Sequence, residues 1–380
     1  MMNITILGWY GTETIGDRAI LAGIFNLLSE VTDEYNIKLG SLYPEFSRRT
    51  LIEDSSFYKQ ISSCYLKQIE LFDSLSIKEL RRAIIWSDIV IIGGGPLMAI
   101  TQMYMLRYAF DYAKKKGVKT AIIGCGWGPL KLKEYVKVAN SIVSHSDLTI
   151  FRDFTSLTEY NNNAFGKANK SVLSAIDPAI FCAEYYRQQP PHAAEDKYIA
   201  INFRDISNDQ YGGDSLKNEQ LFVSILKSML DQYNMPMHLI PMHTFYIGGD
   251  DRSLLNKIAF TLRDNRIKVH NNPPTLSQVM DLYRDAEFCI GMRFHSILLQ
   301  TILNGKNIIL DYTDPQKGKI IGLMKEIGID ANDKSRYISL HAASSLDFPM
   351  VVPEKIDVKD STIEWYKNQY VTHLKALLGI

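Results

Sequence analysis

Arg293 and His295 lie two residues apart in the segment 291–296, which reads Gly-Met-Arg-Phe-His-Ser and directly follows the apolar run Phe288–Ile290. A guanidinium grips a carboxylate or a phosphate through paired N–H donors. An imidazole has a pKa suited to proton transfer near neutral pH. The segment therefore predicts a site that holds a small anion and moves a proton on it.

Two further cations follow apolar runs of the second half of the chain. Arg204 comes directly after the run Tyr198–Phe203, and Lys319 lies shortly beyond Tyr312. The carboxyl ends of parallel strands meet at one edge of a sheet, so we expect Arg204, Arg293, His295 and Lys319 to converge there, above a helix N-terminus. A single histidine at a helix start is more often a cap or a surface residue, but four such residues together favour a ligand.

Glycine-rich loops follow the apolar runs of the first half, at residues 8–17, 93–95 and 124–128. Glycine permits tight turns and lets the backbone approach a ligand closely. The spacing in the first loop is neither that of a dinucleotide fingerprint nor that of a P-loop, so by itself it fits a simple strand-to-helix turn. Asp17 is predicted as a helix cap or an acceptor for a hydroxyl, and Arg152-Asp153 as a buried pair. Together these loops favour a polar ligand such as a sugar.

Short apolar runs alternate with amphipathic stretches along the whole chain, which is typical of a parallel α/β sheet. The predicted strands are Asn3–Leu7, Ile37–Leu42, Ile89–Ile92, Lys119–Ile123, Leu148–Phe151, Ser171–Ile176, Tyr198–Phe203, His238–Pro241, Lys268–His270, Glu287–Ile290 and Asn307–Leu310. The predicted helices include Asp17–Leu28, Thr101–Lys116, Tyr135–His145, Ser215–Tyr233, Asp250–Asp264, Leu276–Arg284, Ser296–Leu303 and Lys319–Ile327.

The alternation breaks near 183–197, where a polar segment with two prolines reads as a linker. We expect a Rossmann-like domain over residues 1–182, a second over 196–358, and a C-terminal helix over 359–380 that returns towards the first domain. Ser361 and Glu364 have the spacing of a capping box at the start of that helix.

The composition is that of a globular protein, with 46% hydrophobic residues and 42 basic residues that balance 42 acidic ones. A net charge of zero argues against nucleic acid or an extended anionic surface as the partner. Cys64, Cys125, Cys182 and Cys289 are far apart and predict buried, reduced thiols. The chain shows neither a signal peptide nor an apolar run of the length that a membrane span requires.

The order of these motifs resembles the polysaccharide pyruvyl transferase family. The resemblance rests on the glycines of the first loop with Gly16-Asp17, on Gly93-Gly94-Gly95, on Arg152-Asp153, on Asp177-Pro178, and on Arg293-Phe294-His295-Ser296 with Tyr312 and Lys319 downstream. It runs from Gly8 to Gly328. Thr14 stands where the family usually has asparagine, and the spacing after Tyr312 leaves Lys317 as an alternative to Lys319.

The resemblance implies two Rossmann-like domains that face a cleft, as in GT-B glycosyltransferases, and a ketal pyruvyltransferase that uses phosphoenolpyruvate. It implies that His295 is the catalytic acid/base and that the donor is bound by Arg204, Arg293, Phe294, His295 and Lys319. The acceptor, a sugar of a bacterial surface polysaccharide such as a capsule or exopolysaccharide, is expected at Gly8, Trp9, Tyr10, Gly11, Asp17, Trp127 and Arg152.

We expect no metal and no cofactor, with phosphoenolpyruvate as a co-substrate, and a cytoplasmic enzyme whose contact with the membrane, for a lipid-linked acceptor, is peripheral. Two other functions fit the same residues. A nucleotide-sugar-dependent glycosyltransferase would hold a pyrophosphate with the arginines, and a non-catalytic module would bind a sugar or a phosphate without turnover.

Overall fold

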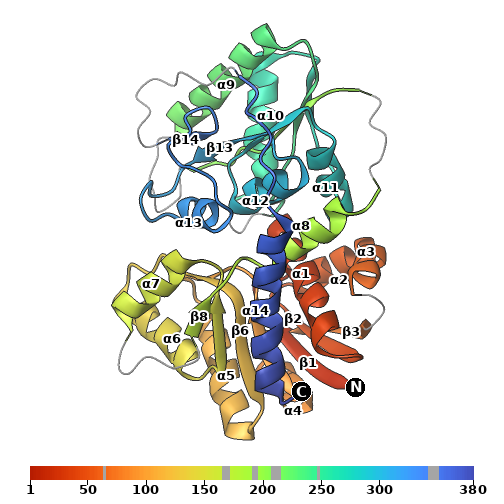
Figure 1. The fold of residues 1–380 in the computed structure, drawn as a ribbon, viewed down its shortest axis with the longest axis vertical. Helices are drawn as coiled ribbons and strands as arrows, with labels where there is room; N and C mark the ends of the chain where they lie inside the picture. The colour runs from red at the N-terminus through yellow and green to blue at the C-terminus, as the bar shows by residue number, and fades with distance from the viewer. Residues whose placement is uncertain (63–65, 165–171, 191–195, 207–214, 246–248, 341–350) are drawn as a thin grey trace. The chain divides into compact units, whose positions relative to one another are not determined.

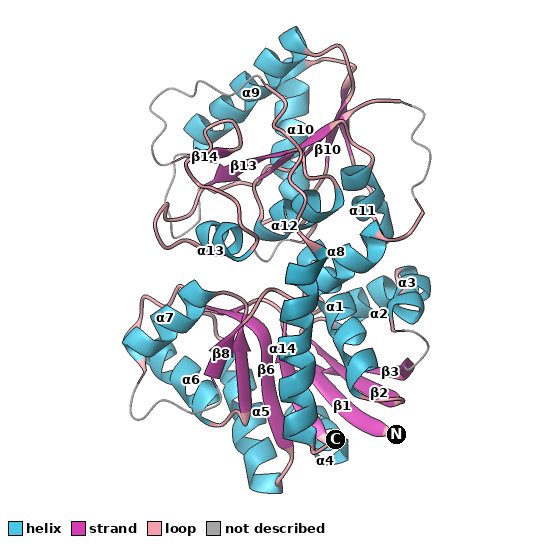
Figure 2. Cartoon of the chain, in the orientation of Figure 1, coloured by secondary structure: helices cyan, strands magenta, loops and turns pink. Residues whose placement is uncertain are grey.

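The computed structural model describes the chain except residues 63–65, 165–171, 191–195, 207–214, 246–248 and 341–350. The described residues form two compact units. Unit 1 comprises Met1–Glu13, Asp17–Cys182 and Asp360–Ile380, and unit 2 comprises Thr14–Gly16 and Ala183–Lys359. Each unit contains a parallel sheet with helices packed on it (Figures 1 and 2).

Unit 1 contains an eight-stranded sheet in the order β3-β2-β1-β4-β6-β7-β8, with β5 paired to β6. Its strands are β1 (Met2–Leu7), β2 (Tyr35–Ser41), β3 (Leu66–Asp73), β4 (Ile89–Gly93), β5 (Pro96–Leu97), β6 (Lys119–Trp127), β7 (Leu148–Phe151) and β8 (Val172–Ser174). Its helices are α2 (Pro44–Glu53), α3 (Ser55–Ile61), α4 (Ile77–Trp86), α5 (Met103–Lys116), α6 (Lys133–Ser144), α7 (Phe154–Asn163) and α14 (Asp360–Leu378), with most of α1 (Ile15–Val31) and the first residues of α8 (Ala179–Arg187).

The central strands of unit 1 are buried on both faces, so their sequences are nearly continuous apolar runs. Val90 and Ile92 pack with the inner sides of α4, α5 and α6 in one hydrophobic cluster. α1 lies on the opposite face, because a Cβ at Gly93 would come within 2.3 Å of Ile24. α14 packs on β6 and β7 of the same unit (Figure 1).

Unit 2 contains a six-stranded sheet in the order β11-β10-β9-β12-β13-β14. Its strands are β9 (Ile199–Ile201), β10 (Met237–Leu239), β11 (Ile267–Val269), β12 (Phe288–Gly291), β13 (Asn307–Asp311) and β14 (Tyr337–Ser339). Its helices are α9 (Ser215–Gln232), α10 (Asp251–Leu262), α11 (Leu276–Arg284), α12 (Phe294–Leu303) and α13 (Lys319–Glu326).

The predicted fold class is confirmed: the chain is α/β, with two Rossmann-like parallel sheets and a C-terminal helix. The strand Leu148–Phe151 and the helix Leu276–Arg284 have the predicted bounds. Cys125, Cys182 and Cys289 are buried free thiols, as predicted, and Cys64 lies outside the described residues.

Several details differ from the prediction. The glycine-rich stretch 124–127 belongs to β6, because Gly126 and Trp127 pair with Pro96 and Leu97 of β5. Strands β3, β5 and β14 were not predicted. Residues 183–187, expected at the start of a linker, continue the helix α8. Ser361 lies inside α14, which begins one residue earlier, at Asp360.

Candidate active site

The sheet of unit 2 changes direction between β9 and β12. The chain runs outwards from β9 through β10 to β11, and then from β12 outwards through β13 to β14. Ligands of open parallel sheets bind at the carboxyl ends of the strands on either side of such a switch point. Arg204 follows β9, and Arg293 follows β12. The two predicted donor arginines therefore flank the switch point.

Arg204, Tyr312 and Lys319 form one cluster at this edge. The Nη1 group of Arg204 donates to the Tyr312 hydroxyl at 2.7 Å, and its guanidinium carbon lies 4.7 Å from the centre of the Tyr312 ring. The Lys319 ammonium lies 5.3 Å from the same ring centre. The Tyr312 ring is buried. A phenol ring in contact with two cations holds them near one another, because the face of the ring carries negative potential.

The two lysines that the sequence left as alternatives have different surroundings. Lys319 is half-buried and is the first residue of α13, where the helix N-terminus adds N–H donors. Lys317 is exposed and precedes the helix. The geometry thus favours Lys319 as the second cation of the cluster.

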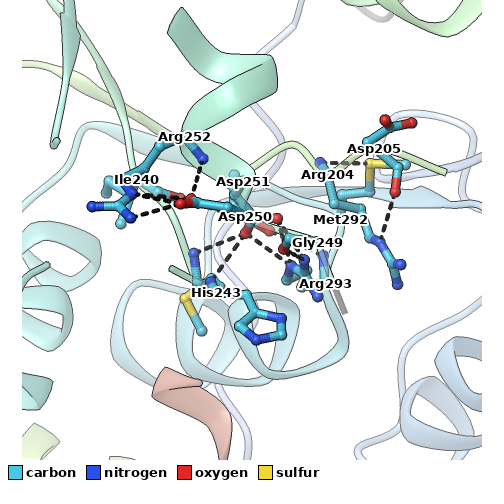
Figure 3. Close-up of polar contacts among 12 residues, drawn as sticks. Arg204, Asp205, Ile240, His243, Gly249, Asp250, Asp251, Arg252, Met292 and Arg293 are labelled. Atoms are coloured by element: carbon cyan, nitrogen blue, oxygen red, sulfur yellow. Dashed lines mark hydrogen bonds and ion pairs between the residues drawn. The ribbon is translucent and has the colours of Figure 1, made fainter. Parts of the chain in front are cut away.

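Arg293 is held by a carboxylate that the sequence did not single out (Figure 3). Its Nε donates to Oδ1 and Oδ2 of Asp251 at 3.0 and 2.8 Å, and its Nη2 donates to Oδ1 at 2.5 Å. Nη2 also donates to the Gly249 carbonyl at 3.3 Å, and the Arg293 backbone N–H donates to the Asn202 side chain at 3.1 Å. Both the backbone and the guanidinium of Arg293 are therefore fixed.

Asp251 and Asn202 are the residues that the sequence analysis missed. Asn202 directly precedes the Phe203-Arg204 pair, and its buried amide also donates to the Ile240 carbonyl at 3.0 Å. Asp251 follows Asp250, which caps α10. A pair of aspartates that opens a helix after a predicted strand was the signal that could have found it.

His295 is the second residue of α12, which Arg293 precedes as the N-cap. Its half-buried ring stands edge-on to the Phe294 ring, with centroids 5.0 Å apart. Gly16, which belongs to unit 2, lies directly against the imidazole: a Cβ at Gly16 would be 2.0 Å from His295 Nδ1. The residues around Gly16 are anchored in the same unit, because the Ile15 N–H donates to the Met242 carbonyl at 3.0 Å.

The predicted acceptor residues of the first loop are packed into unit 1. The Tyr10 hydroxyl donates to the Gly93 carbonyl at 2.6 Å, and Trp9 Nε1 donates to the Pro96 carbonyl at 3.0 Å. Trp9 is 5% and Tyr10 4% exposed, and burial raises the pKa of Tyr10 well above its usual value. Both side chains thus bind the ends of neighbouring strands, since Gly93 is the last residue of β4 and Pro96 the first of β5. Stacking of their ring faces on a sugar stays a prediction.

The remaining residues of that loop have local structural roles. Gly8 faces the Gly93 carbonyl, which would lie 2.5 Å from a Cβ there, and Gly11 has a φ of +89°. Asp17 lies within the first turn of α1 and not at its cap. Their part in acceptor binding stays a prediction.

Trp127 and Arg152 are also buried. The Trp127 ring packs edge-on against the rings of Phe151 and Tyr160, at centroid distances of 6.1 and 5.3 Å. The Arg152 guanidinium lies over Gly126 and forms ion pairs with Asp153 at 3.5 Å and Asp177 at 3.6 Å. The predicted Arg152–Asp153 pair is confirmed, and binding of the acceptor by these side chains stays a prediction.

Within the described residues, no group of three or more His, Cys, Asp or Glu side chains is arranged to hold a metal ion. The same part of the chain contains no helix with the length and apolar character needed to cross a bilayer.

Solved structures with the same fold include sugar-nucleotide epimerases. The UDP-GlcNAc 2-epimerase of Methanocaldococcus jannaschii, in complex with UDP-GlcNAc and UDP, is 13% identical, with a TM-score of 0.56 over 99% of this chain and 100% of that one. A putative UDP-N-acetylglucosamine 2-epimerase from Listeria monocytogenes is 12% identical, with a TM-score of 0.56 over 100% and 91%. S. aureus MnaA with UDP is 12% identical, with a TM-score of 0.54 over 100% and 91%. At these identities the likeness shows the fold alone.

The sequence profile of one family matches most of the chain. The match runs from residue 15 to residue 315, and so it includes the switch point of unit 2, the Arg293–His295 segment and Tyr312. This chain belongs to the polysaccharide pyruvyl transferase family.

Proposed function

We propose that this transferase moves the pyruvyl group of phosphoenolpyruvate onto two hydroxyls of a saccharide, which forms a pyruvate ketal and releases phosphate. One observation carries the proposal: Arg204 and Lys319 meet at Tyr312, while Arg293 and His295 follow the neighbouring strand β12 of the same unit. The family's name supports a saccharide as the acceptor.

The charges of the donor fit this cluster. Phosphoenolpyruvate carries a carboxylate and a phosphate, and the phosphate alone contributes about −1.5 to −2 at neutral pH. The Arg293 guanidinium suits the carboxylate, because its Nη1 group offers charge-assisted N–H donors while Nε and Nη2 are held by Asp251 and Gly249. Arg204 and Lys319 supply positive charge for the phosphate, with the N-terminus of α13 adding backbone donors.

His295 is proposed to transfer the proton that starts the reaction. An imidazolium protonates C3 of the enol, C2 becomes electrophilic, and the first sugar hydroxyl adds to C2 and gives up its proton. The bond between C2 and the phosphate oxygen then breaks, and the second hydroxyl adds at C2 to close the ketal. Of the two hydroxyl protons, one replaces the proton delivered to C3 and the other leaves with phosphate, so the atoms balance.

Thermal denaturation of the purified protein tests the donor. Phosphoenolpyruvate at 100 times its Kd should stabilise the protein by about 2.7 kcal/mol, and UDP should leave the Tm unchanged. The opposite pattern would support the nucleotide-sugar alternative and refute the proposal. His295→Ala should keep the Tm shift and lose phosphate release in the presence of a saccharide acceptor.

The acceptor is found by a second assay. Phosphate release is followed with a panel of sugars and oligosaccharides, and the ketal is identified by mass spectrometry. Binding of phosphoenolpyruvate without any phosphate release across the panel would support a non-catalytic module.

A further inference from the structure

We propose that Asp251 is a positioning residue of the donor site, which fixes Arg293 directly and the segment beside His295 through the backbone at Met242 and His243. The proposal rests on the proposed function, because the site that Asp251 would position is the phosphoenolpyruvate site. It assigns a role to a residue that contacts neither the donor nor the reacting atoms.

The Asp251 carboxylate is the centre of a buried hydrogen-bond network (Figure 3). Its side chain is 1% exposed, against 15% for Arg293. Besides the guanidinium, Oδ2 accepts from the backbone N–H groups of Met242 and His243 at 3.0 and 3.2 Å. The Asp251 N–H donates to the His243 carbonyl at 3.0 Å in return. One carboxylate thus joins the loop after β10 to the loop after β12.

The position of Asp251 in its helix suits a fixed negative charge. It is the first residue of α10, and the positive end of the helix dipole favours an anion there. A buried ion pair is a weak source of stability. The place of Asp251 at the carboxyl edge of the sheet therefore favours a role in orienting Arg293.

The pair also changes what Arg293 offers a donor. The Asp251 carboxylate offsets the guanidinium charge and accepts from its Nε and Nη2, and Nη2 also donates to the Gly249 carbonyl. Among the described residues, no hydrogen bond involves Nη1. Arg293 therefore presents an oriented set of donors and little net charge, and Arg204 with Lys319 supply the net positive charge.

The second branch of the network leads to the catalytic histidine. Thr14 forms an isolated antiparallel bridge with His243, and Ile15 donates to Met242, so the loop that Asp251 holds in turn holds residues 14–16. Gly16, the last of these, lies against the His295 imidazole. The Asp251 carboxylate thus positions the Arg293 guanidinium and, through residues 14–16, the backbone at Gly16 against which the His295 imidazole lies.

Asp251→Asn and Asp264→Asn test the proposal as a matched pair. Asp264 lies beyond the other end of α10 and also binds an arginine, Arg266, through both carboxylate oxygens. Asp251→Asn should raise the Kd for phosphoenolpyruvate, measured by calorimetry, roughly 10- to 100-fold, because a hydrogen bond to a charged group is lost at the residue that holds the donor. Asp264→Asn should leave that Kd unchanged.

A readout on Arg293 itself separates this proposal from the proposed function. In the wild type, the Nε–H of Arg293, assigned by comparison with Arg293→Lys, should exchange slowly with water in NMR spectra, and Asp251→Asn should accelerate the exchange. If Asp251→Asn accelerates this exchange and leaves the Kd for phosphoenolpyruvate unchanged, the positioning role is overturned. A wild type that binds no phosphoenolpyruvate would overturn the proposed function, while the exchange measurement would still report on the Asp251–Arg293 pair.

Asp251→Glu covers the case in which the asparagine variant does not fold. The longer side chain keeps the charge and moves the guanidinium, so the KM for phosphoenolpyruvate should rise at least tenfold while kcat changes less. Equal losses in kcat and in folded fraction, with the KM unchanged, would show that Asp251 is only structural.

Discussion

Gly16→Ala should slow the enzyme strongly with little effect on its stability. The new Cβ would lie 2.0 Å from His295 Nδ1 and 2.5 Å from Cγ, whereas ordinary contacts begin at 3.4 Å. The imidazole must therefore withdraw by about 1.4 Å, the difference between 3.4 and 2.0 Å. A misplacement of about 1 Å at a reacting group can cost about 100-fold in rate, so we expect a loss of that size in kcat.

The expected change in stability is small because two terms oppose each other. An off-rotamer imidazole costs about 0.5–1.5 kcal/mol. Alanine is favoured over glycine within a helix by about 1 kcal/mol, and Gly16 lies in the first turn of α1. The free energy of unfolding should therefore stay within about 1 kcal/mol of the wild type.

The assay combines phosphate release from phosphoenolpyruvate with thermal denaturation. Gly117→Ala is the control: Gly117 has a φ of +70°, and a Cβ at this position would meet nothing within 4 Å, so alanine there adds backbone strain and no contact. It should lower the Tm and leave kcat unchanged. A Gly16→Ala enzyme with wild-type kcat and Tm would refute either the role of His295 in proton transfer or the dependence of that role on the contact with Gly16.

Three further outcomes are expected. Tyr312→Phe removes the hydroxyl that accepts from Arg204, which should weaken phosphoenolpyruvate binding about fivefold by calorimetry; an unchanged Kd would mean that the hydroxyl does not orient Arg204. Lys319→Ala should reduce kcat/KM for phosphoenolpyruvate far more than Lys317→Ala, and the reverse order would point to the exposed lysine. Burial, with help from neighbouring cations, lowers the pKa of His238 from 6.5 to about 4, so its contribution to stability is present above pH 6.5 and is lost as the pH falls towards 4. Urea unfolding should show a smaller loss of stability over that range in His238→Phe than in the wild type; an equal loss would assign the acid sensitivity to other groups.

The fold was most predictable from the sequence in strands whose burial on both faces requires a continuous run of apolar residues. Strands that are covered on both faces, such as Ile89–Gly93, consist almost wholly of β-branched residues and are recognisable without a structure. Strand β3 lies at the edge of its sheet, and its exposed Lys67, Gln68 and Glu70 interrupt the apolar pattern. The continuation of β6 through Gly124 depends on pairing with β5 and β7, which no local pattern records.

The candidate site was predictable in position and not in its contacts. The rule that ligands bind at the carboxyl ends of strands located Arg204, Arg293 and Lys319. The partner of Arg293 is 42 residues away in sequence, so only the folded sheet brings the Asp251 carboxylate to it. The burial of Trp9 was missed for a similar reason, since its partner lies 87 residues further along the chain.

The helix α14 belongs to unit 1 but follows unit 2 in the sequence. Its Tyr370 hydroxyl donates to the Ile176 carbonyl at 2.5 Å, and the fully buried Tyr370 ring packs edge-on against Phe181. Residues 183–359 leave the ribosome before α14 does, so unit 2 has all of its chain available while unit 1 still lacks the helix that packs on β6 and β7. Removal of α14 should therefore lower the stability of unit 1 and leave that of unit 2 unchanged.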